Sequence, residues 1–309
     1  QNTGANVSAV GYQSAYQNTG NNVSAMGWRT ARENSGGYVS AMGVSSARTN
    51  TGDYVSAMGH SSAYQNTGDY VSAMGHSSAY QNTGANVSAV GYQSAYQNSG
   101  TAVTVMGYEA GRGNSSNHFT GVGFHAGRYS DPTNTVALGS FAGYGNSVTR
   151  STYSNGTFVG YGSGYALTTG SNNTLLGYLA GYNMTTGTSN TVVGNFTTTA
   201  GITTGSNNIL IGSDVRPADG TASNQMNIGN LLYATGLGVG NTNATSGRVG
   251  IGTTAPDSQL DVEGAITAGA GGTLVGQTLL QANYVTGSDD FPTVIGAQRS
   301  TGHLAQGYG

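Results

Sequence analysis

The amino-acid sequence is poor in charge and lacks two residue types altogether. None of its 309 residues is cysteine or lysine, and only 7% are charged. Without cysteine, neither a disulfide framework nor a thiolate metal site can form. The nine arginines are scattered and the net charge is −3, so there is no basic stripe to neutralise the phosphates of a nucleic acid. No apolar run approaches the roughly 20 residues that span a bilayer, and we expect no membrane insertion of this segment.

Glycine is abundant instead, and one series of glycines is periodic. The chain has 53 glycines, and the first members of this series lie 16 residues apart. Low charge with much Gly, Asn, Ser and Thr is also typical of disorder, but a disordered chain does not keep aliphatic residues in phase. A fixed period of this kind predicts a solenoid of stacked coils. The series consists of Gly11, Gly27, Gly43, Gly59, Gly75, Gly91, Gly107, Gly123 and Gly139, and with small insertions of Gly160, Gly177, Gly194, Gly212 and Gly229.

The residue before each of these glycines is apolar in every repeat. We take the glycine as position 0 of its repeat and number the neighbouring residues from it. A strand that is always apolar at position −1 predicts a buried column, in which methionine fills irregular gaps. The predicted core column consists of Val10, Met26, Met42, Met58, Met74, Val90, Met106, Val122 and Leu138, and it continues at Val159, Leu176, Val193, Ile211 and Ile228.

Positions −2 and −4 are also apolar, so the predicted strand has two apolar faces. Alternate residues of a strand point to opposite faces. One face can fill the interior of the coil, but a thin coil of a single chain leaves the other in water. We assign the face with Val7, Val23 and Val39 to contacts between chains, and predict a homotrimer in which folding and assembly are one event.

A second short segment follows each glycine and ends in a turn. It has the form Tyr12-Gln13-Ser14-Ala15-Tyr16, and its small residues suit a close approach of backbones. The next residues, Gln17-Asn18-Thr19-Gly20, are typical of a turn. One repeat is therefore predicted to be strand, glycine corner, strand and turn. The predicted fold class is all-β, a parallel β-solenoid or β-roll with coils of about 16 residues stacked about 4.8 Å apart.

Changes in the pattern divide the chain into four sections. Residues 1–145 carry the regular repeats, and residues 146–229 carry Thr- and Asn-rich repeats with a larger core. Residues 230–266 are predicted to form a neck and residues 267–309 a small C-terminal β tip. Residue 1 falls within a repeat, because residues 1–18 are identical to residues 81–98, and we expect an upstream segment that attaches the fibre to a virion or cell surface.

Two sets of motifs resemble known families. Ser8-Ala9-Val10-Gly11 and residues 134–139 resemble the head repeats of trimeric autotransporter adhesins, which implies a trimeric left-handed parallel β-roll. Residues 207–212 and 227–230, Gly250-Ile251-Gly252-Thr253-Thr254-Ala255-Pro256 and residues 260–264 are similar to segments of bacteriophage tail fibres. In that family a self-cleaving chaperone often follows such a segment, and none is evident in this sequence.

We therefore predict a structural fibre of a virion, extracellular and part of a phage tail, that attaches to a host cell through a surface glycan or protein receptor. Specific recognition needs a unique constellation of residues, whereas a repeated surface offers the same weak contact many times. The receptor contact is accordingly placed in the tip, at Tyr284, Asp289, Asp290, Phe291, Arg299 and His303. An auxiliary, multivalent contact is assigned to an aromatic column at position +1, formed by Tyr12, Trp28, Tyr92, Tyr108 and Phe124.

Other functions remain as alternatives. A bacterial trimeric adhesin or appendage filament on the cell surface would use the same repeats. A tailspike-type polysaccharide depolymerase is less favoured. An ice-binding solenoid is the least favoured hypothesis, because a Thr ladder at one constant position is not evident.

Residues that could carry chemistry are few, and we predict that the chain is not an enzyme. Asp53 and Asp69 lie one period apart, so stacked coils would bring their carboxylates near the separation found in retaining glycosidases. Aspartate after glycine is, however, typical of turn hydrogen bonding. His60 and His76 stack in the same way without an evident third ligand. No catalytic residue, metal site or cofactor is predicted.

Overall fold

The computed structural model describes residues 1–195, 201–237 and 247–263. Within these ranges the chain forms β-strands and no helix, and all 17 strands belong to one sheet. The strands of the first nine coils are β1 (Ser8–Val10), β2 (Val23–Met26), β3 (Val39–Met42), β4 (Ser56–Met58), β5 (Val71–Met74), β6 (Val87–Val90), β7 (Val103–Met106), β8 (Phe119–Val122) and β9 (Thr135–Leu138). The others are β10 (Thr157–Val159), β11 (Thr174–Leu176), β12 (Thr191–Val193), β13 (Ile209–Ile211), β14 (Met226–Ile228), β15 (Leu232–Thr235), β16 (Arg248–Ile251) and β17 (Leu260–Val262).

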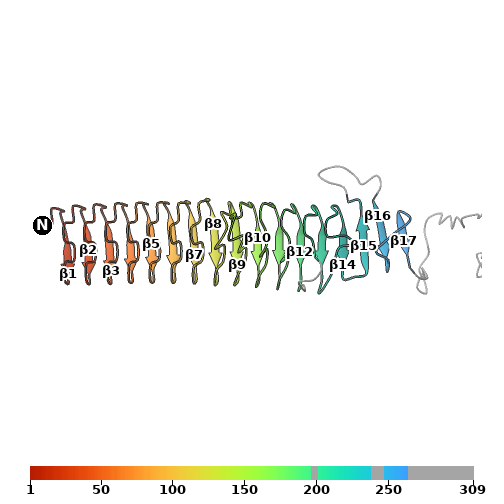
Figure 1. Cartoon of the computed structure of the whole chain (residues 1–309), viewed down its shortest axis with the longest axis horizontal. Helices are drawn as coiled ribbons and strands as arrows, with labels where there is room; N and C mark the ends of the chain where they lie inside the picture. Colours follow the sequence, from red (N-terminus) through yellow and green to blue (C-terminus); the bar gives the residue numbers. More distant parts are fainter. Residues whose placement is uncertain (196–200, 238–246, 264–309) are drawn as a thin grey trace, which may run out of the picture. The chain divides into compact units, whose positions relative to one another are not determined.

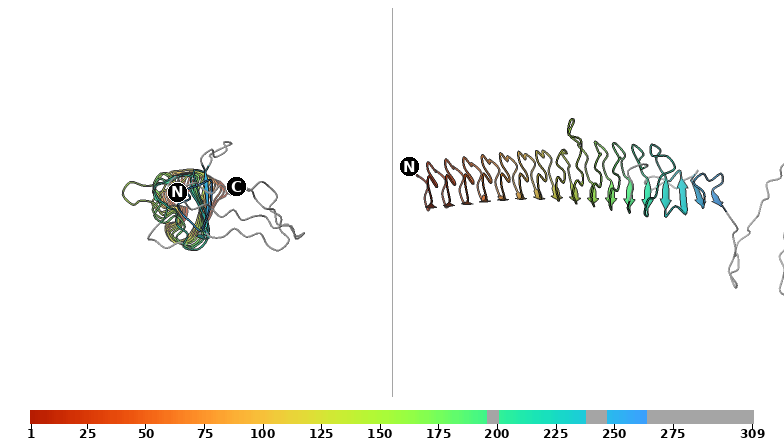
Figure 2. Two further views of the ribbon diagram at one scale, coloured as in Figure 1. Left: turned by 90° about the vertical axis from the view of Figure 1, so that its right-hand side faces the viewer. Right: turned by 60° about the horizontal axis from the view of Figure 1, so that its bottom comes forward.

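The predicted parallel β-solenoid is confirmed. Strands β1 to β14 are parallel, and each pairs with the strand of the next coil (Figure 1). Equivalent residues are in register, so that Ser40 lies beside Ser24 and Ser56. The strands follow one side of the stack, and the turn segments occupy the other (Figure 2). Each position of the repeat therefore becomes a continuous column along the solenoid.

The segment after each glycine is not the second strand that the sequence predicted. Glycines such as Gly59 adopt a φ of 134°, and positions +2, +4 and +6 then have φ near 50°, as at Ser61 and Ala63. The backbone still bonds to both neighbours, because the Ser61 N–H donates to the carbonyl of Val44 and the Ala63 N–H donates to that of Ser78, each at 2.8 Å. Alternating left-handed residues make the chain curl more tightly than a strand can.

The assignment of the two strand faces was also wrong. Positions −4 and −2 fill the interior of the coil, where Val39 is 1% and Ala41 4% exposed, whereas Met42 at position −1 points outward and is 46% exposed. The interior is narrow and already holds the alanine at position +4, so it accepts only short side chains. No member of the predicted core column is buried, including those after Leu138. The first nine members are Val10, Met26, Met42, Met58, Met74, Val90, Met106, Val122 and Leu138.

A ladder of buried asparagines at position +7 fills the opposite side of each interior. Asn66 is fully buried, and its Nδ2 donates to Oδ1 of Asn50 at 2.8 Å and to the carbonyl of Gly68 at 2.7 Å. Its own Oδ1 accepts from Nδ2 of Asn82 at 2.8 Å. The same bonds recur from coil to coil, and the ladder consists of Asn18, Asn34, Asn50, Asn66, Asn82, Asn98 and Asn114.

The later coils have larger interiors. Phe119, Phe158 and Leu175 are fully buried where earlier coils have valine and alanine. Glycine replaces alanine at position +4 from Gly111 to Gly181, and a Cβ at Gly127 would collide with the ring of Phe119. The loop between β9 and β10 is longer than its neighbours and extends outward (Figure 2).

The parallel order ends after β14. Strand β15 is antiparallel to both β14 and β16, and β17 is again parallel to β16. This change begins three residues after Gly229, the last glycine of the periodic series. The coil therefore stops where the sequence period stops.

Candidate functional site

An apolar stripe runs along the outer face of the sheet. We define the apolar stripe as the residues at position −1 of strands β1 to β14. Because the strands are in register, each member lies beside the next, as Met42 lies beside Met26 and Met58. The members in β1 to β5 and β7 are about half exposed, from 46% to 59%. A continuous exposed apolar surface marks a site of interaction.

The predicted aromatic column is present next to the apolar stripe. Tyr92, Tyr108 and Phe124 stack with ring centroids 4.9 and 5.2 Å apart, and Tyr12 stacks on Trp28 at 6.4 Å. All five rings are between 40% and 62% exposed. The rings therefore stiffen the stack by contact between coils and still present their edges and faces to solvent. Binding of a sugar by this column stays a prediction.

A second column, at position +5, contains both tyrosine and arginine. Tyr80 stacks on Tyr64 at 5.0 Å and on Tyr96 at 4.9 Å, and the Arg112 guanidinium lies 5.1 Å from the Tyr96 ring centroid. The spacing of these residues is evident in the sequence, but the role of arginine as a stacking partner in place of tyrosine was not predicted. The column consists of Tyr16, Arg32, Arg48, Tyr64, Tyr80, Tyr96, Arg112, Arg128, Tyr144, Tyr165 and Tyr182.

A charge cluster lies between the coils that follow β7 and β8. The Glu109 side chain is only 7% exposed, and its carboxylate lies 2.8 Å from Nε of Arg128, 3.1 Å from Nη1 of Arg112 and 3.1 Å from Nε2 of His125. Glu109 and His125 both occupy position +2 of their repeats. Because equivalent positions of neighbouring repeats stack, this shared position indicates that the two side chains lie close together. The charge cluster was not predicted from the sequence.

The charge cluster disfavours protonation of its histidine. Burial lowers the pKa of the His125 imidazole below its usual range, and the Arg128 guanidinium lowers it further; together they outweigh the Glu109 carboxylate, which acts in the opposite direction. The folded chain therefore holds His125 neutral more strongly than the unfolded chain does.

A pH dependence of stability follows from this shift. The stability that depends on neutral His125 is complete above the unfolded pKa of about 6.5, and it is lost as the pH falls from there through the folded pKa. We expect the melting temperature of the wild type to fall more between pH 7.5 and 5.5 than that of His125→Phe, which has the residue of Phe141 at the same repeat position. Gln93→Phe, an equivalent change without a histidine, should keep the wild-type slope. Equal slopes for all three proteins would contradict the prediction.

The structure places the four residues weighed for chemistry in coil-to-coil contacts. Oδ1 of Asp69 accepts the backbone N–H of Asp53 at 2.8 Å, and Oδ1 of Asp53 accepts that of Gly37 at 2.7 Å. His60 and His76 stack at 4.8 Å with 6° between their planes. No group of three or more His, Cys, Asp or Glu that could hold a metal ion occurs within residues 1–195, 201–237 and 247–263.

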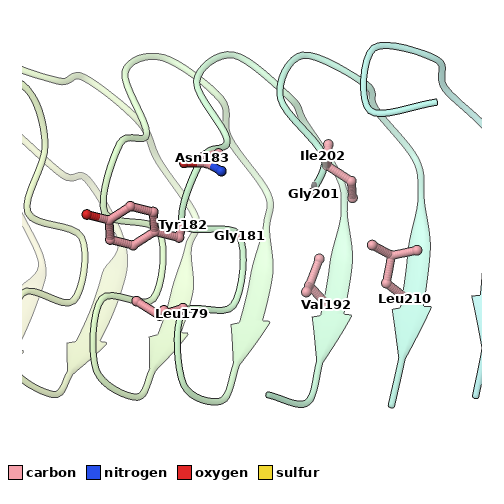
Figure 3. A pocket seen from close by; sticks show the side chains of 8 residues that line it. All are labelled: Leu179, Gly181, Tyr182, Asn183, Val192, Gly201, Ile202 and Leu210. Carbon is pink, nitrogen blue, oxygen red and sulfur yellow. The ribbon is translucent and has the colours of Figure 1, made fainter. Parts of the chain in front are cut away.

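A small cavity lies within the later coils. Its volume is about 20 Å³, which is room for about one water molecule. Figure 3 shows Val192 of β12 and Leu210 of β13 on its lining, with Ile202 from the segment between them. The cavity is a gap in the packing of the enlarged core and is too small for a ligand.

The candidate receptor-binding residues of the tip lie outside the described residues. These are Tyr284, Asp289, Asp290, Phe291, Arg299 and His303. The structure therefore leaves the predicted receptor contact untested.

In the part of the chain that the structure describes, no helix has the length and apolar character needed to cross a membrane. Comparison of the chain with protein-family models, with curated proteins and with solved structures found no match.

Proposed function

We propose that the chain forms the shaft of a homotrimeric fibre that attaches a virion, as a bacteriophage tail fibre, to the surface of a host cell. The observation that carries this proposal is the apolar stripe, which continues without a polar member from Val10 to Ile228. A partner that covers such a stripe needs the same repeat along its length. Further copies of this chain, aligned in parallel, have that repeat, and three copies around one axis cover all the stripes symmetrically.

The charge pattern of the outer sheet face supports packing between identical chains. Positions −1 and −3 of β1 to β14 contain no charged residue. Like charges would face one another when equivalent columns of identical chains meet, and this repulsion would oppose assembly. The serines and threonines at position −3 are small and neutral, so they allow the sheets to approach closely.

The virion assignment rests on the sequence resemblance. Two of the tail-fibre-like segments begin in β16, at Gly250, and in β17, at Leu260, just beyond the point where the parallel order of the solenoid ends. Host attachment by the tip, through a surface glycan or protein receptor, is part of the same proposal. The alternative is a bacterial trimeric adhesin, which the head-like repeats support; a depolymerase is supported least.

The proposal is tested by mass and by location. The purified chain should sediment as a particle of three chains of 31.1 kDa each. Antibodies raised against residues 1–145 should label the tails of virions in electron micrographs and block their adsorption to host cells. Labelling of intact bacteria without virions would favour the adhesin, and a stable folded monomer at micromolar concentration would contradict the trimer.

A further inference from the structure

A cleft opens on the outside of the coils that follow β9, β10 and β11. Its volume is about 280 Å³, which is at the lower end of the range of small-molecule sites. It is larger and more open than the small cavity of Figure 3, although both include Leu179 and Tyr182. The cleft is lined by Phe141, Tyr161, Tyr165, Tyr178, Leu179 and Tyr182.

The cleft lies beside a repeat that has no side chain at position +2. Position +2 has a left-handed backbone in these coils, and it carries Phe141 in the preceding coil and Leu179 in the following one, with φ of 59° and 55°. Gly162 occupies the same position between them with φ of 61°. A Cβ at Gly162 would come within 2.8 Å of Leu179 Cδ2 and 3.2 Å of Tyr182 Cδ2. Since other residues tolerate this backbone, the glycine is needed for space and not for its conformation.

Two pairs of stacked tyrosines line the cleft. Tyr161 and Tyr178, at position +1, stack at 5.4 Å with 15° between their planes. Tyr165 and Tyr182, at position +5, stack at 4.7 Å with 11° between their planes. Phe141 also lines the cleft. Its ring is nearly perpendicular to that of Tyr161, with 5.8 Å between the ring centroids and 77° between the planes. The aromatic column and the tyrosine–arginine column therefore border one hollow, with four phenol groups around it.

We propose that this cleft binds one neutral pyranose ring of a host surface glycan. The inference rests on the proposed function, since it supplies the shaft with a defined glycan site. The chemistry of the lining favours this ligand. The exposed ring surface accepts the apolar C–H groups of a sugar, and the tyrosine hydroxyls donate hydrogen bonds to its hydroxyl groups and accept hydrogen bonds from them. The lining has no acidic or basic residue, so it offers no partner for a sialic or uronic acid. The volume suits one ring and not an oligosaccharide.

Position +2 provides a variant that fills the cleft without a new backbone conformation. Gln13 and Gln93 occupy this position with φ of 51° and 50°, so Gly162→Gln has an allowed backbone. Its Cβ displaces the end of the Leu179 side chain, which lines the cleft, and we expect the glutamine to fill the hollow. Tyr178→Ala removes part of a wall. Tyr54→Ala is the control, because Tyr54 is an exposed, stacked tyrosine that lies outside both the cleft lining and the aromatic column.

The experiment titrates the full-length protein with the methyl glycosides of glucose, mannose, galactose, N-acetylglucosamine and rhamnose. Saturation-transfer NMR with irradiation of aromatic protons reports binding. We expect at least one glycoside to bind the wild type and the Tyr54→Ala variant equally, and to bind Gly162→Gln and Tyr178→Ala about tenfold more weakly or not at all.

Sedimentation of the same proteins separates this inference from the proposed function. Wild-type trimers that bind none of the five glycosides, or equal binding by all four proteins, would overturn the glycan site and leave the trimeric fibre standing. A wild type that is monomeric would instead overturn the fibre. Loss of trimers in Tyr178→Ala together with unchanged binding by Gly162→Gln would show that the cleft is a contact between chains, and would also overturn the inference.

Discussion

Replacement of Met58 by aspartate should abolish trimers at micromolar concentration. Met58 lies within the apolar stripe, beside Met42 and Met74, and is 46% exposed in the single chain. In the proposed trimer, three carboxylates would enter one layer between the chains, where no cation is available to pair with them. Burial of an unpaired ion costs several kcal/mol even after relaxation. Sedimentation velocity should show three chains for the wild type and none of that mass for Met58→Asp.

A control separates the stripe from a general effect of charge. Thr67 is exposed in the turn of the same coil, on the side away from the stripe (Figure 2), and Thr67→Asp should sediment like the wild type. We expect the β-sheet circular dichroism of Met58→Asp to fall together with the trimer, because an uncovered stripe would remain in water. A trimeric Met58→Asp with the wild-type melting temperature would show that the apolar stripe is not the contact between chains.

The sequence was sufficient to predict the coil, because the coil depends on glycines that no other residue can replace. Gly59 has a φ of 134°, and a Cβ there would lie 2.4 Å from the carbonyl oxygen of Gly75 in the next coil. A contact of this kind recurs at nearly every coil, which imposes the period on the sequence. The apolar −1, −2 and −4 positions likewise predicted a strand with two apolar faces, as the structure has it.

The sequence did not predict which face lies inside. Val39, Ala41 and Met42 are all apolar, and hydrophobicity alone favours the largest of them for the core. The width of the interior decides instead, and it depends on a tight segment with left-handed residues at Ser45 and Ala47. Periodicity cannot distinguish that segment from a strand, because its small and polar residues alternate as they do in a strand.

The asparagine ladder was missed for a similar reason. Asn66 lies between Gln65 and Thr67-Gly68, and this local sequence is the same as that of an ordinary exposed turn. Only the stacking of coils at a constant spacing converts each turn amide into a partner of the next. On the outside, the side-chain amide of the neighbouring Gln81 donates an equivalent hydrogen bond to Oε1 of Gln65 at 2.8 Å. The sequence does not show which of the two amide columns is buried.

Replacement of Asn66 by alanine should therefore destabilise the chain strongly. The change removes the donor to Asn50 Oδ1 and to the Gly68 carbonyl, and the acceptor for Asn82 Nδ2. Each of the three buried groups left without its partner costs about 1 to 3 kcal/mol, so the total should be about 3 to 9 kcal/mol. The melting temperature should fall by about 10 °C or more.

Gln81→Ala is the matched control for the buried ladder. Gln81 donates to Gln65 Oε1 at 2.8 Å and accepts from Gln97 at 2.9 Å, in the same geometry as the asparagines but in contact with solvent. Water replaces the lost partners there, so the cost should stay below about 1 kcal/mol. Melting curves followed by circular dichroism compare both variants with the wild type. If the two variants melt at the same temperature, burial of the amide ladder does not stabilise the solenoid, and the interior must be held by the Val and Ala columns alone.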